Sequence, residues 1–277
     1  MIIGGKQFDT ERGVYIMGIL NVTPDSFSDG GNYDKMDEAL RRVEEMIKQG
    51  AEIIDVGGES TRPNHIKISD EEEIDRVSPI ISRIRENFDI PLSLDSYKSK
   101  VIEANLSQID LINDIWGLKF DPKMAALIAR SEKACCLMHN RTASDYGNFF
   151  EDVISDLKES LQFAAAAGIA QDKIILDGGV GFQKNHEQNL AIINRTDALC
   201  KLGYPVMLAT SRKSTIGYVL DQTVDNRLYG TLATAVVGVM KGASFVRVHD
   251  VFQHWDAIQM TKSILEEQKW TKSQSKA

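Results

Sequence analysis

Two groups of polar side chains in the sequence suit the two halves of one reaction. The first group consists of carboxylates and one amide. A carboxylate accepts two N–H groups at once, so residues of this kind can hold a flat, nitrogen-rich heterocycle. They would serve equally as ligands of a hard metal ion if their oxygens converged within about 2.5 Å of one point. The members of this group are Asp55, Asp95, Asn113 and Asp177.

The second group is cationic. Arg247 and His249 stand two residues apart, so on a strand their side chains lie on the same face. A helix that begins near Asp250 would add backbone N–H groups at its N-terminus, and such a set of donors suits a diphosphate. The alternative is that these residues make ordinary ion pairs at the rim of a loop. The members of this group are Arg62, Arg212, Lys213, Arg247 and His249.

Other patterns in the sequence argue against several common chemistries. The run DGGVGF at 177–182 fits neither G-x-G-x-x-G nor G-x-x-x-x-G-K-[ST], so it predicts a tight turn with a close backbone approach. No H-E-x-x-H is present, and no Ser-His-acid order can be argued. Cys135 and Cys136 lie inside a predicted strand, where a nucleophile is not expected. The histidines interpreted as isolated surface or core residues are His65, His186 and His254.

The elements that must position these groups alternate regularly along the chain. Short apolar runs predict strands, and apolar residues between them recur at spacings of three and four, which is typical of amphipathic helices. The repeat is about 30 residues, which favours an α/β fold of the (β/α)₈ TIM-barrel type over an open doubly wound sheet. Residues 1–13 hold Gly4 and Gly5 between short apolar pieces, which predicts a short N-terminal β-hairpin. The predicted strands lie at 14–20, 53–56, 91–94, 111–112, 134–138, 174–176, 205–208 and 245–248.

Polar or ionisable residues lie at the end of each of these eight predicted strands. The carboxyl ends of parallel strands in a barrel meet at one face, and that face holds the active site in barrels of this kind. Each residue taken singly is also a common turn former or helix cap, but capping does not account for all eight positions together. The residues concerned are Asn21, Asp55, Asp95, Asn113, Asp114, His139, Asp177, Ser211, Arg212, Lys213, Arg247 and His249.

Two stretches carry predictions about individual helices. Ser69 followed three residues later by Glu72 is a capping-box pattern, and the acidic run 70–73 is interpreted as first-turn charges rather than as a metal site. Pro79 lies inside the same helical pattern, which predicts a kink or a broken first half. The stretch 231–241 is apolar nearly all round, which is typical of a helix packed close to a sheet.

Composition sets further limits on function. The 277 residues carry a formal net charge of −8, which gives no electrostatic reason to expect nucleic acid or an anionic membrane as a partner. No apolar run approaches the roughly 20 residues that span a bilayer, and the first residues lack the pattern of a secretory signal. Three cysteines form no disulfide framework, so the cytoplasm is the expected compartment. We expect one domain over 1–277, with a frayed tail at 271–277.

Six long segments in a fixed order give the sequence a resemblance to a known family. Together they resemble the dihydropteroate synthase family of pterin-binding enzymes over essentially the whole chain. The segments are MGILNVTPDSFSDGG (17–31), DVGGESTRP (55–63), SLDSYKSKV (93–101), LINDIWG (111–117), SRKSTIG (211–217) and VRVHDV (246–251).

The resemblance implies a transferase of folate biosynthesis built on a (β/α)₈ barrel. The family condenses 6-hydroxymethyl-7,8-dihydropterin diphosphate with 4-aminobenzoate to give 7,8-dihydropteroate and diphosphate. The bond from the pterin methylene to the diphosphate breaks early, and the neutral amine attacks the resulting cation. Carboxylates such as Asp95 would stabilise that cation, and the loops after the first two strands would exclude water. The resemblance also implies Mg²⁺, a homodimer and inhibition by sulfonamides as aminobenzoate mimics.

The same resemblance assigns roles to residues of this chain. The catalytic residues would be Asp95, Lys213, Arg247 and His249. The pterin ring would be held by Asp95, Asn113, Asp177, Lys213 and Thr61. The diphosphate would be bound by Arg247, His249 and Asn21, of which Asn21 would also contact Mg²⁺. The aminobenzoate pocket would consist of Phe27, Thr61, Arg62, Pro63, Phe182, Lys213 and Ser214.

Some positions depart from the family pattern. Gly178 stands where a proline is usual, Asn64 where a glycine is usual and Ser96 where threonine is common. The Asp177 carboxylate is retained, so we expect altered loop stiffness rather than lost binding. The segment NRTASDYGNFF after His139 matches the family least and is assigned no role, while His139 stays a candidate.

Two competing functions share parts of this pattern. A pterin-binding methyltransferase barrel that passes methyl groups from tetrahydrofolate to a corrinoid would use the same carboxylates. It has no use for the ESTRP loop or for a diphosphate site at Arg247 and His249. A pterin-binding homologue without turnover is the second alternative, and the intact Lys213 and Arg247 argue against it.

Overall fold

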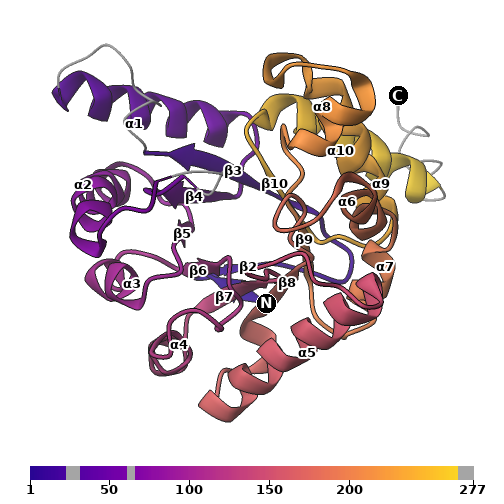
Figure 1. Ribbon diagram of the computed structural model, residues 1–277. Helices are drawn as coiled ribbons and strands as arrows, with labels where there is room; N and C mark the ends of the chain where they lie inside the picture. The colour runs from indigo at the N-terminus through magenta and orange to yellow at the C-terminus, as the bar shows by residue number, and fades with distance from the viewer. Residues whose placement is uncertain (23–31, 61–65, 268–277) are drawn as a thin grey trace, which may run out of the picture.

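The computed structural model describes residues 1–22, 32–60 and 66–267 and contains a closed barrel of eight parallel strands (Figure 1). The strands follow one another around the barrel in the order β10-β3-β4-β5-β6-β7-β8-β9. The predicted (β/α)₈ TIM barrel is therefore confirmed, and each predicted strand has its counterpart. The strands are β3 (Tyr15–Asn21), β4 (Ile53–Gly57), β5 (Leu92–Asp95), β6 (Leu111–Asp114), β7 (Ala134–Met138), β8 (Ile174–Asp177), β9 (Val206–Leu208) and β10 (Phe245–Val248).

Helices connect the strands and surround the barrel (Figure 1). Among the described residues, none of these helices has the length and apolar character needed to cross a membrane. The helices are α1 (Asn32–Lys48), α2 (Asp70–Asn87), α3 (Ser99–Asn105), α4 (Met124–Ser131), α5 (Phe149–Ala167), α6 (His186–Asn194), α7 (Thr196–Cys200), α8 (Ser214–Leu220), α9 (Leu228–Met240) and α10 (Val251–Leu265), with short 3₁₀ turns at Gln171–Lys173 and Val224–Asn226.

A two-stranded hairpin closes the N-terminal end of the barrel, as the sequence predicts. Strands β1 (Ile2–Ile3) and β2 (Lys6–Gln7) pair antiparallel. Ile3 and the following Phe8 are buried in the same apolar cluster as Met17 and Phe245 from the barrel strands. This end of the barrel is therefore filled mainly with apolar side chains.

The two faces of the barrel strands carry different residues. The outward face packs against the helices with residues such as Ile54 and Leu176. The inward face begins with the apolar layer that includes Ile53, Leu111, Ile175 and Phe245. Successive inward positions are two residues apart. The next inward position on each of these strands is therefore polar, namely Asp55, Asn113, Asp177 and Arg247.

Helix α2 corrects one prediction and extends another. Ser69 caps it by accepting a hydrogen bond from the N–H of Glu72, but the helix runs unbroken through Pro79, so the predicted break is wrong. The side chains of Val77, Ile80, Ile81 and Ile84 are buried on either side of the proline, and this packing offsets the lost backbone hydrogen bond.

The acidic run at the start of α2 is not only a set of first-turn charges. Glu73 is buried, and its Oε2 lies 2.8 Å from Lys98 Nζ, which is also 2.6 Å from Glu59 Oε2. Lys98 follows β5 and Glu59 follows β4, so the ammonium joins two loops of the barrel mouth to α2. The run does lie in the first turn of α2, as predicted, and Glu73 has the further role of holding Lys98.

Helix α9 packs close to the sheet, as predicted, since a Cβ added at Gly238 would lie 2.3 Å from Leu208 Cδ2 of β9. It is apolar nearly all round, yet not all of its apolar side chains pack on the sheet. Tyr229 is 81% exposed, and Met240 is 61% exposed. One apolar side of this helix is therefore left uncovered by the described part of the chain.

Candidate active site

The centre of the barrel mouth is a buried ion cluster around Arg247. Its Nε lies 2.5 Å from Asp55 Oδ2, and its NH2 group lies 2.7 Å from Asp95 Oδ2. Asn113 donates a further hydrogen bond from Nδ2 to Asp55 Oδ2 at 3.3 Å. The residues come from β10, β4, β5 and β6. The guanidinium of the predicted cationic group thus lies between two carboxylates of the predicted acidic group, so the two groups meet in the structure.

The cluster leaves hydrogen-bond acceptors unused. Asp55 Oδ1 and Asp95 Oδ1 are both buried and have no hydrogen-bond partner among the described residues. Burial raises the pKa of Asp95 to about 7, with Asp55 adding to the rise and Arg247 opposing it. Two desolvated carboxylate oxygens without donors are costly unless a ligand supplies N–H groups.

Asp177 and Lys213 belong to the same electrostatic cluster. Asp177 is buried at the end of β8, where burial raises its pKa and its Oδ1 accepts a hydrogen bond from the N–H of Gly179 at 2.7 Å. Lys213 precedes α8, and its pKa is lowered to about 8 by loss of hydration and by the charge of Arg247, with Asp177 and Asp95 opposing. The structure thus brings together Asp95, Asp177, Lys213 and Arg247.

His249 acts as a neutral donor rather than as a cation. Burial, together with the charges of Arg247 and Arg212, lowers the pKa of His249 to about 3. The hydroxyl of Ser211 accepts a hydrogen bond from the backbone N–H of His249 and lies 2.8 Å from its Nδ1. We assign the hydroxyl proton to the bond with Nδ1, because the hydroxyl then both donates and accepts, and this assignment leaves the Nε2–H of His249 as a donor. The inclusion of His249 among the cations is wrong.

Arg212 is used in a structural ion pair. Its guanidinium makes two hydrogen bonds to Asp250, at 2.6 and 3.0 Å, and Asp250 precedes α10. Its backbone φ is 56°, in the left-handed region. The alternative of an ordinary ion pair at the rim therefore holds for Arg212. Ser214, the first residue of α8, is exposed beside Lys213.

The diphosphate and metal predictions fall at the end of β3. A cavity of about 590 Å³ is lined there by residues that include Asn21, Arg41, Arg42 and His249. Arg42 donates a hydrogen bond to the backbone carbonyl of His249 at 2.6 Å. A larger cavity of about 650 Å³, bordered by α1 and Phe88, includes none of the predicted site residues.

The side chains that could act as metal ligands at this cavity determine how Mg²⁺ could be bound there. Within 1–22, 32–60 and 66–267, no three His, Cys, Asp or Glu side chains converge as a metal site. Asn21 offers one amide oxygen. Mg²⁺ is commonly held by few protein ligands when substrate phosphates supply the others. The residues present therefore fit Mg²⁺ only as an ion bound together with a diphosphate.

An apolar cluster at the same end of the barrel was not predicted in full. Tyr97, Ile115 and Met138 are buried together, and Trp116 and Phe182 pack against them. Of these five residues, only Phe182 is predicted from the sequence as a site residue. Ile115 lies two residues after Asn113, and Met138 lies two residues after inward-facing Cys136, so strand alternation was the signal that would have found them. A flat ring bound above the ion cluster would meet this apolar surface.

The glycine run after β8 is a tight turn, as predicted. Gly179 and Gly181 have φ values of 70° and 87°, which favour glycine. At Gly178 an added Cβ would lie 2.5 Å from Ile192 Cγ2, so the side chain of Ile192 fills the space at this departure from the family pattern.

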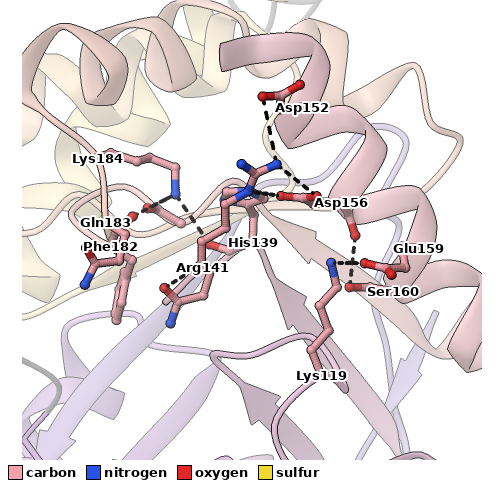
Figure 2. Close-up of polar contacts among 12 residues, drawn as sticks. Lys119, His139, Arg141, Asp152, Asp156, Glu159, Ser160, Phe182, Gln183 and Lys184 are labelled. Atoms are coloured by element: carbon pink, nitrogen blue, oxygen red, sulfur yellow. Dashed lines mark hydrogen bonds and ion pairs between the residues drawn. The ribbon is translucent and has the colours of Figure 1, made fainter. Parts of the chain in front are cut away.

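His139 and the segment after it have a structural role. Nε2 of His139 lies 2.9 Å from Asp156 Oδ2 on α5, and Nε of Arg141 donates to the same oxygen at 2.6 Å (Figure 2). Burial lowers the pKa of His139 to about 3, so the ring is neutral and donates to Asp156.

His186 stacks on Tyr218 at 3.9 Å, and His254 is fully buried. The predicted residues that lie outside the described part of the chain are Phe27, Thr61, Arg62, Pro63, Asn64, His65 and the tail 271–277.

Comparison with known proteins defines the class of this site. The model of the family described as pterin binding enzyme matches residues 17–249, a span that includes all eight barrel strands except the first two residues of β3. A barrel whose mouth carries buried carboxylates beside an apolar surface is thus matched to enzymes that bind pterins.

Individual relatives narrow this class. A dihydropteroate synthase of Clostridium beijerinckii is 53% identical over 96% of this chain and 99% of its own, and one of Bacillus subtilis is 52% identical over 86% and 84%. A crystal structure of dihydropteroate synthase from Clostridium difficile in the presence of pteroic acid has a TM-score of 0.91 at 45% identity, covering 93% of this chain and 99% of that one. A structure of the Xanthomonas albilineans enzyme with 4-aminobenzoic acid also has a TM-score of 0.91, at 33% identity, covering 95% and 97%. The chain belongs to the dihydropteroate synthase family.

The ion cluster predicts a stability effect. Replacing Arg247 by methionine leaves Asp55 and Asp95 buried side by side without their shared cation, so we expect the free energy of unfolding to fall by about 3 kcal/mol. Urea denaturation followed by circular dichroism measures the change. Arg212→Met is the control, because its more exposed pair with Asp250 is expected to contribute about 1 kcal/mol or less. Equal losses in the two variants would contradict this account of Arg247.

Proposed function

We propose that the barrel mouth described above condenses 6-hydroxymethyl-7,8-dihydropterin diphosphate with 4-aminobenzoate, giving 7,8-dihydropteroate and diphosphate. The chain belongs to the family of this folate-biosynthetic transferase. The observation that carries the placement is a pair of buried carboxylate oxygens, Asp55 Oδ1 and Asp95 Oδ1, for which the described part of the chain supplies no donor. A pterin ring presents several N–H groups in one plane, and these would satisfy both oxygens.

The ring would lie on the ion cluster. Asp95, Asn113 and Asp177 would hold its N–H groups and ring nitrogens, Lys213 would donate to an acceptor on its edge, and Thr61 would add a further contact. Met138 and Ile115 belong to the apolar cluster that would face the ring. The polar and apolar surfaces at the mouth together suit a flat heterocycle whose edge makes hydrogen bonds.

Bond cleavage would place charge where the site already has counter-charges. The bond between the pterin methylene carbon and the diphosphate oxygen breaks, and both electrons leave with the oxygen. The remaining cation is delocalised into the ring, where Asp95 in its ionised form stabilises it. Arg247 and the Nε2–H of His249 would stabilise the departing diphosphate.

The second step needs no strong base. The neutral amine of 4-aminobenzoate donates its lone pair to the methylene carbon, a C–N bond forms, and the surplus proton passes to water or diphosphate. Asn21 would hold Mg²⁺, which when bound neutralises part of the diphosphate charge. The loops that contain Phe27 and Thr61 would limit access of water to the cation.

The aminobenzoate pocket would lie beside Lys213. The Lys213 ammonium lies 4.4 Å from the centroid of the Phe182 ring, within the range of a cation–π contact. Lys213, Phe182 and Ser214 would form one wall, and Phe27, Thr61, Arg62 and Pro63 would complete the pocket. Sulfonamides, which imitate 4-aminobenzoate, would compete there, and a related enzyme from Yersinia pestis has been solved as a sulfonamide drug complex. We place the enzyme in the cytoplasm.

One assay separates this function from its alternatives. Diphosphate release is measured from the pterin diphosphate with and without 4-aminobenzoate, and release that depends on both substrates is the expected result. A methyltransferase barrel or a binding protein without turnover would bind the pterin without releasing diphosphate. That outcome would overturn the proposal.

Two cations are expected to be necessary for turnover. Lys213→Ala and Arg247→Ala should each lower kcat by at least about tenfold, because each removes a charge beside the developing charges of the reaction. Steady-state diphosphate release measures the effect, with circular dichroism to establish that each variant is folded. Lys201→Ala, at an exposed lysine of the outer surface, is the control and should keep full turnover. An unchanged kcat in either variant removes that residue from the site.

The pH dependence of kcat/KM for the pterin diphosphate should be bell-shaped. Asp95 has its pKa raised to about 7 and must be ionised to stabilise the cation, so kcat/KM falls as the pH drops below 7. Lys213 has its pKa lowered to about 8 and must be protonated, so kcat/KM falls again above 8. Asp95→Asn lowers the maximum and should remove the acid limb. An acid limb that persists in this variant would assign it to another group.

We further propose that the partner of this chain is a second copy of itself. Helices α8, α9 and α10 lie together in Figure 1, and α9 packs against both others. Apart from Tyr218, which stacks on His186, their exposed apolar side chains are left accessible to solvent by the described part of the chain, and burying such surface between two copies is favourable. The exposed apolar side chains of these helices are Tyr218, Val219, Leu220, Tyr229, Val237, Met240, Phe252, Trp255, Met260, Ile264 and Leu265.

A charge placed on this surface should weaken the dimer. Met240→Glu puts a carboxylate among apolar side chains, so we expect the dimer fraction in sedimentation velocity to fall. Phe163→Glu, at a similarly apolar but separate exposed position on α5, is the control and should leave the dimer unchanged. A monomeric wild-type chain at micromolar concentration would overturn the proposal.

A further inference from the structure

The mechanism above makes no use of Lys184, whose ammonium is nevertheless fully bonded. Its Nζ donates to the backbone carbonyl oxygens of Gly179 at 2.9 Å, Phe182 at 3.0 Å and His139 at 3.4 Å (Figure 2). An ammonium has three N–H groups, so all of them are accounted for. Two of the acceptors belong to the glycine turn after β8, and the third belongs to the end of β7.

The position of Lys184 is costly for a cation. Loss of hydration and the charge of Lys213 lower its pKa to about 7, with Asp177 and Asp156 opposing. Its hydrogen bonds go to neutral carbonyl groups. Because these bonds only partly replace the lost hydration of the ammonium, we interpret Lys184 as a residue that holds the three carbonyl groups in place.

The turn that surrounds Lys184 has an unusual backbone, with strain at one residue, Gln183. Within five residues, Gly179, Gly181 and Gln183 all have positive φ, at 70°, 87° and 44°. The last of these is not a glycine. A Cβ added at Gly179 would lie 2.0 Å from the carbonyl oxygen of His139, so the turn also presses against β7. Conformations of this kind persist when surrounding contacts over-determine them.

Contacts from the loop after β7 hold the other side of the turn. Ser144 donates a hydrogen bond to the backbone carbonyl of Gln183 at 2.9 Å. His139, which supplies one of the three acceptors of Lys184, is itself fixed through its hydrogen bond to Asp156 on α5 (Figure 2). Lys184 therefore joins a strained turn to a rigid part of the barrel wall.

Phe182 is the residue of this turn that would line the aminobenzoate pocket. Its ring lies under the ammonium of Lys213 at 4.4 Å, and a Cβ added at neighbouring Gly181 would lie 3.0 Å from Lys213 Cδ. A shift of the turn would therefore move the aromatic wall and the lysine together. We propose that Lys184 is a positioning residue that fixes Phe182 against Lys213 and so determines the affinity for the arylamine substrate. This role rests on the proposed function of the site.

The first test separates the two substrates. Lys184→Met keeps most of the apolar stem and removes the three donors, so the KM for 4-aminobenzoate should rise about tenfold, while kcat and the KM for the pterin diphosphate stay within about threefold. Lys201→Met makes the same replacement at an exposed lysine and should change none of these values. An equal rise in both KM values would overturn the proposal, because Lys184 would then act through Asp177 and the pterin.

The second test asks whether Lys184 acts through Phe182. In a Phe182→Ala background, Lys184→Met should raise the KM for 4-aminobenzoate by no more than about twofold, since the ring it positions is already absent. A rise of the same size as in the wild-type background would show independent effects and overturn the proposal.

A third measurement does not depend on catalysis. Hydrogen exchange of the backbone amides in 178–185 should be at least about tenfold faster in Lys184→Met than in the wild type, with unchanged exchange in the barrel strands. Unchanged exchange in the turn would overturn the proposed positioning, even in an active enzyme. Absence of diphosphate release by the wild type would instead overturn the function, and the exchange result would still decide whether Lys184 holds the turn.

Discussion

The structure of the barrel mouth depends on one interaction, the sharing of Arg247 between Asp55 and Asp95. Two carboxylates desolvated side by side repel one another, and a guanidinium between them offsets that repulsion through hydrogen bonds to both. Among the described residues, one oxygen of each carboxylate still has no donor. A site built in this way is anionic and acceptor-rich before any substrate arrives, so it needs little reorganisation when a cation forms above it.

The neighbouring charges adjust to this centre. The pKa of Asp95 is raised and the pKa of Lys213 is lowered, so both lie close to neutrality and each depends on the ionisation of the other. His249 has its pKa lowered so far that it serves as a neutral hydrogen-bond donor. Arg247 therefore keeps its positive charge, while the charges of Asp95 and Lys213 change near neutral pH and depend on what is bound beside them.

The loops around the mouth are held by two lysines in a similar way, of which Lys98 is buried and Lys184 is half-buried. Lys98 joins Glu59 and Glu73, which links the loops after β4 and β5 to α2. Lys184 joins the turns after β7 and β8 through three carbonyl groups. In both cases one ammonium connects segments that are distant in sequence, so loop positions are set by long-range contacts rather than by local turn chemistry alone.

The sequence by itself determined the barrel, its hairpin and the set of strand-end residues. Strand periodicity is a local property, since alternating positions on one strand face opposite ways whatever the rest of the chain does, and this places Asp55, Asn113, Asp177 and Arg247 inside. Only the tertiary structure decided how these side chains pair. The contact of Arg247 with Asp55 spans 192 residues, the burial of Glu73 depends on Lys98, and the neutrality of His249 depends on desolvation by its surroundings. Ion pairing, burial and pKa are set by what lies nearby in space, and sequence spacing does not contain that information.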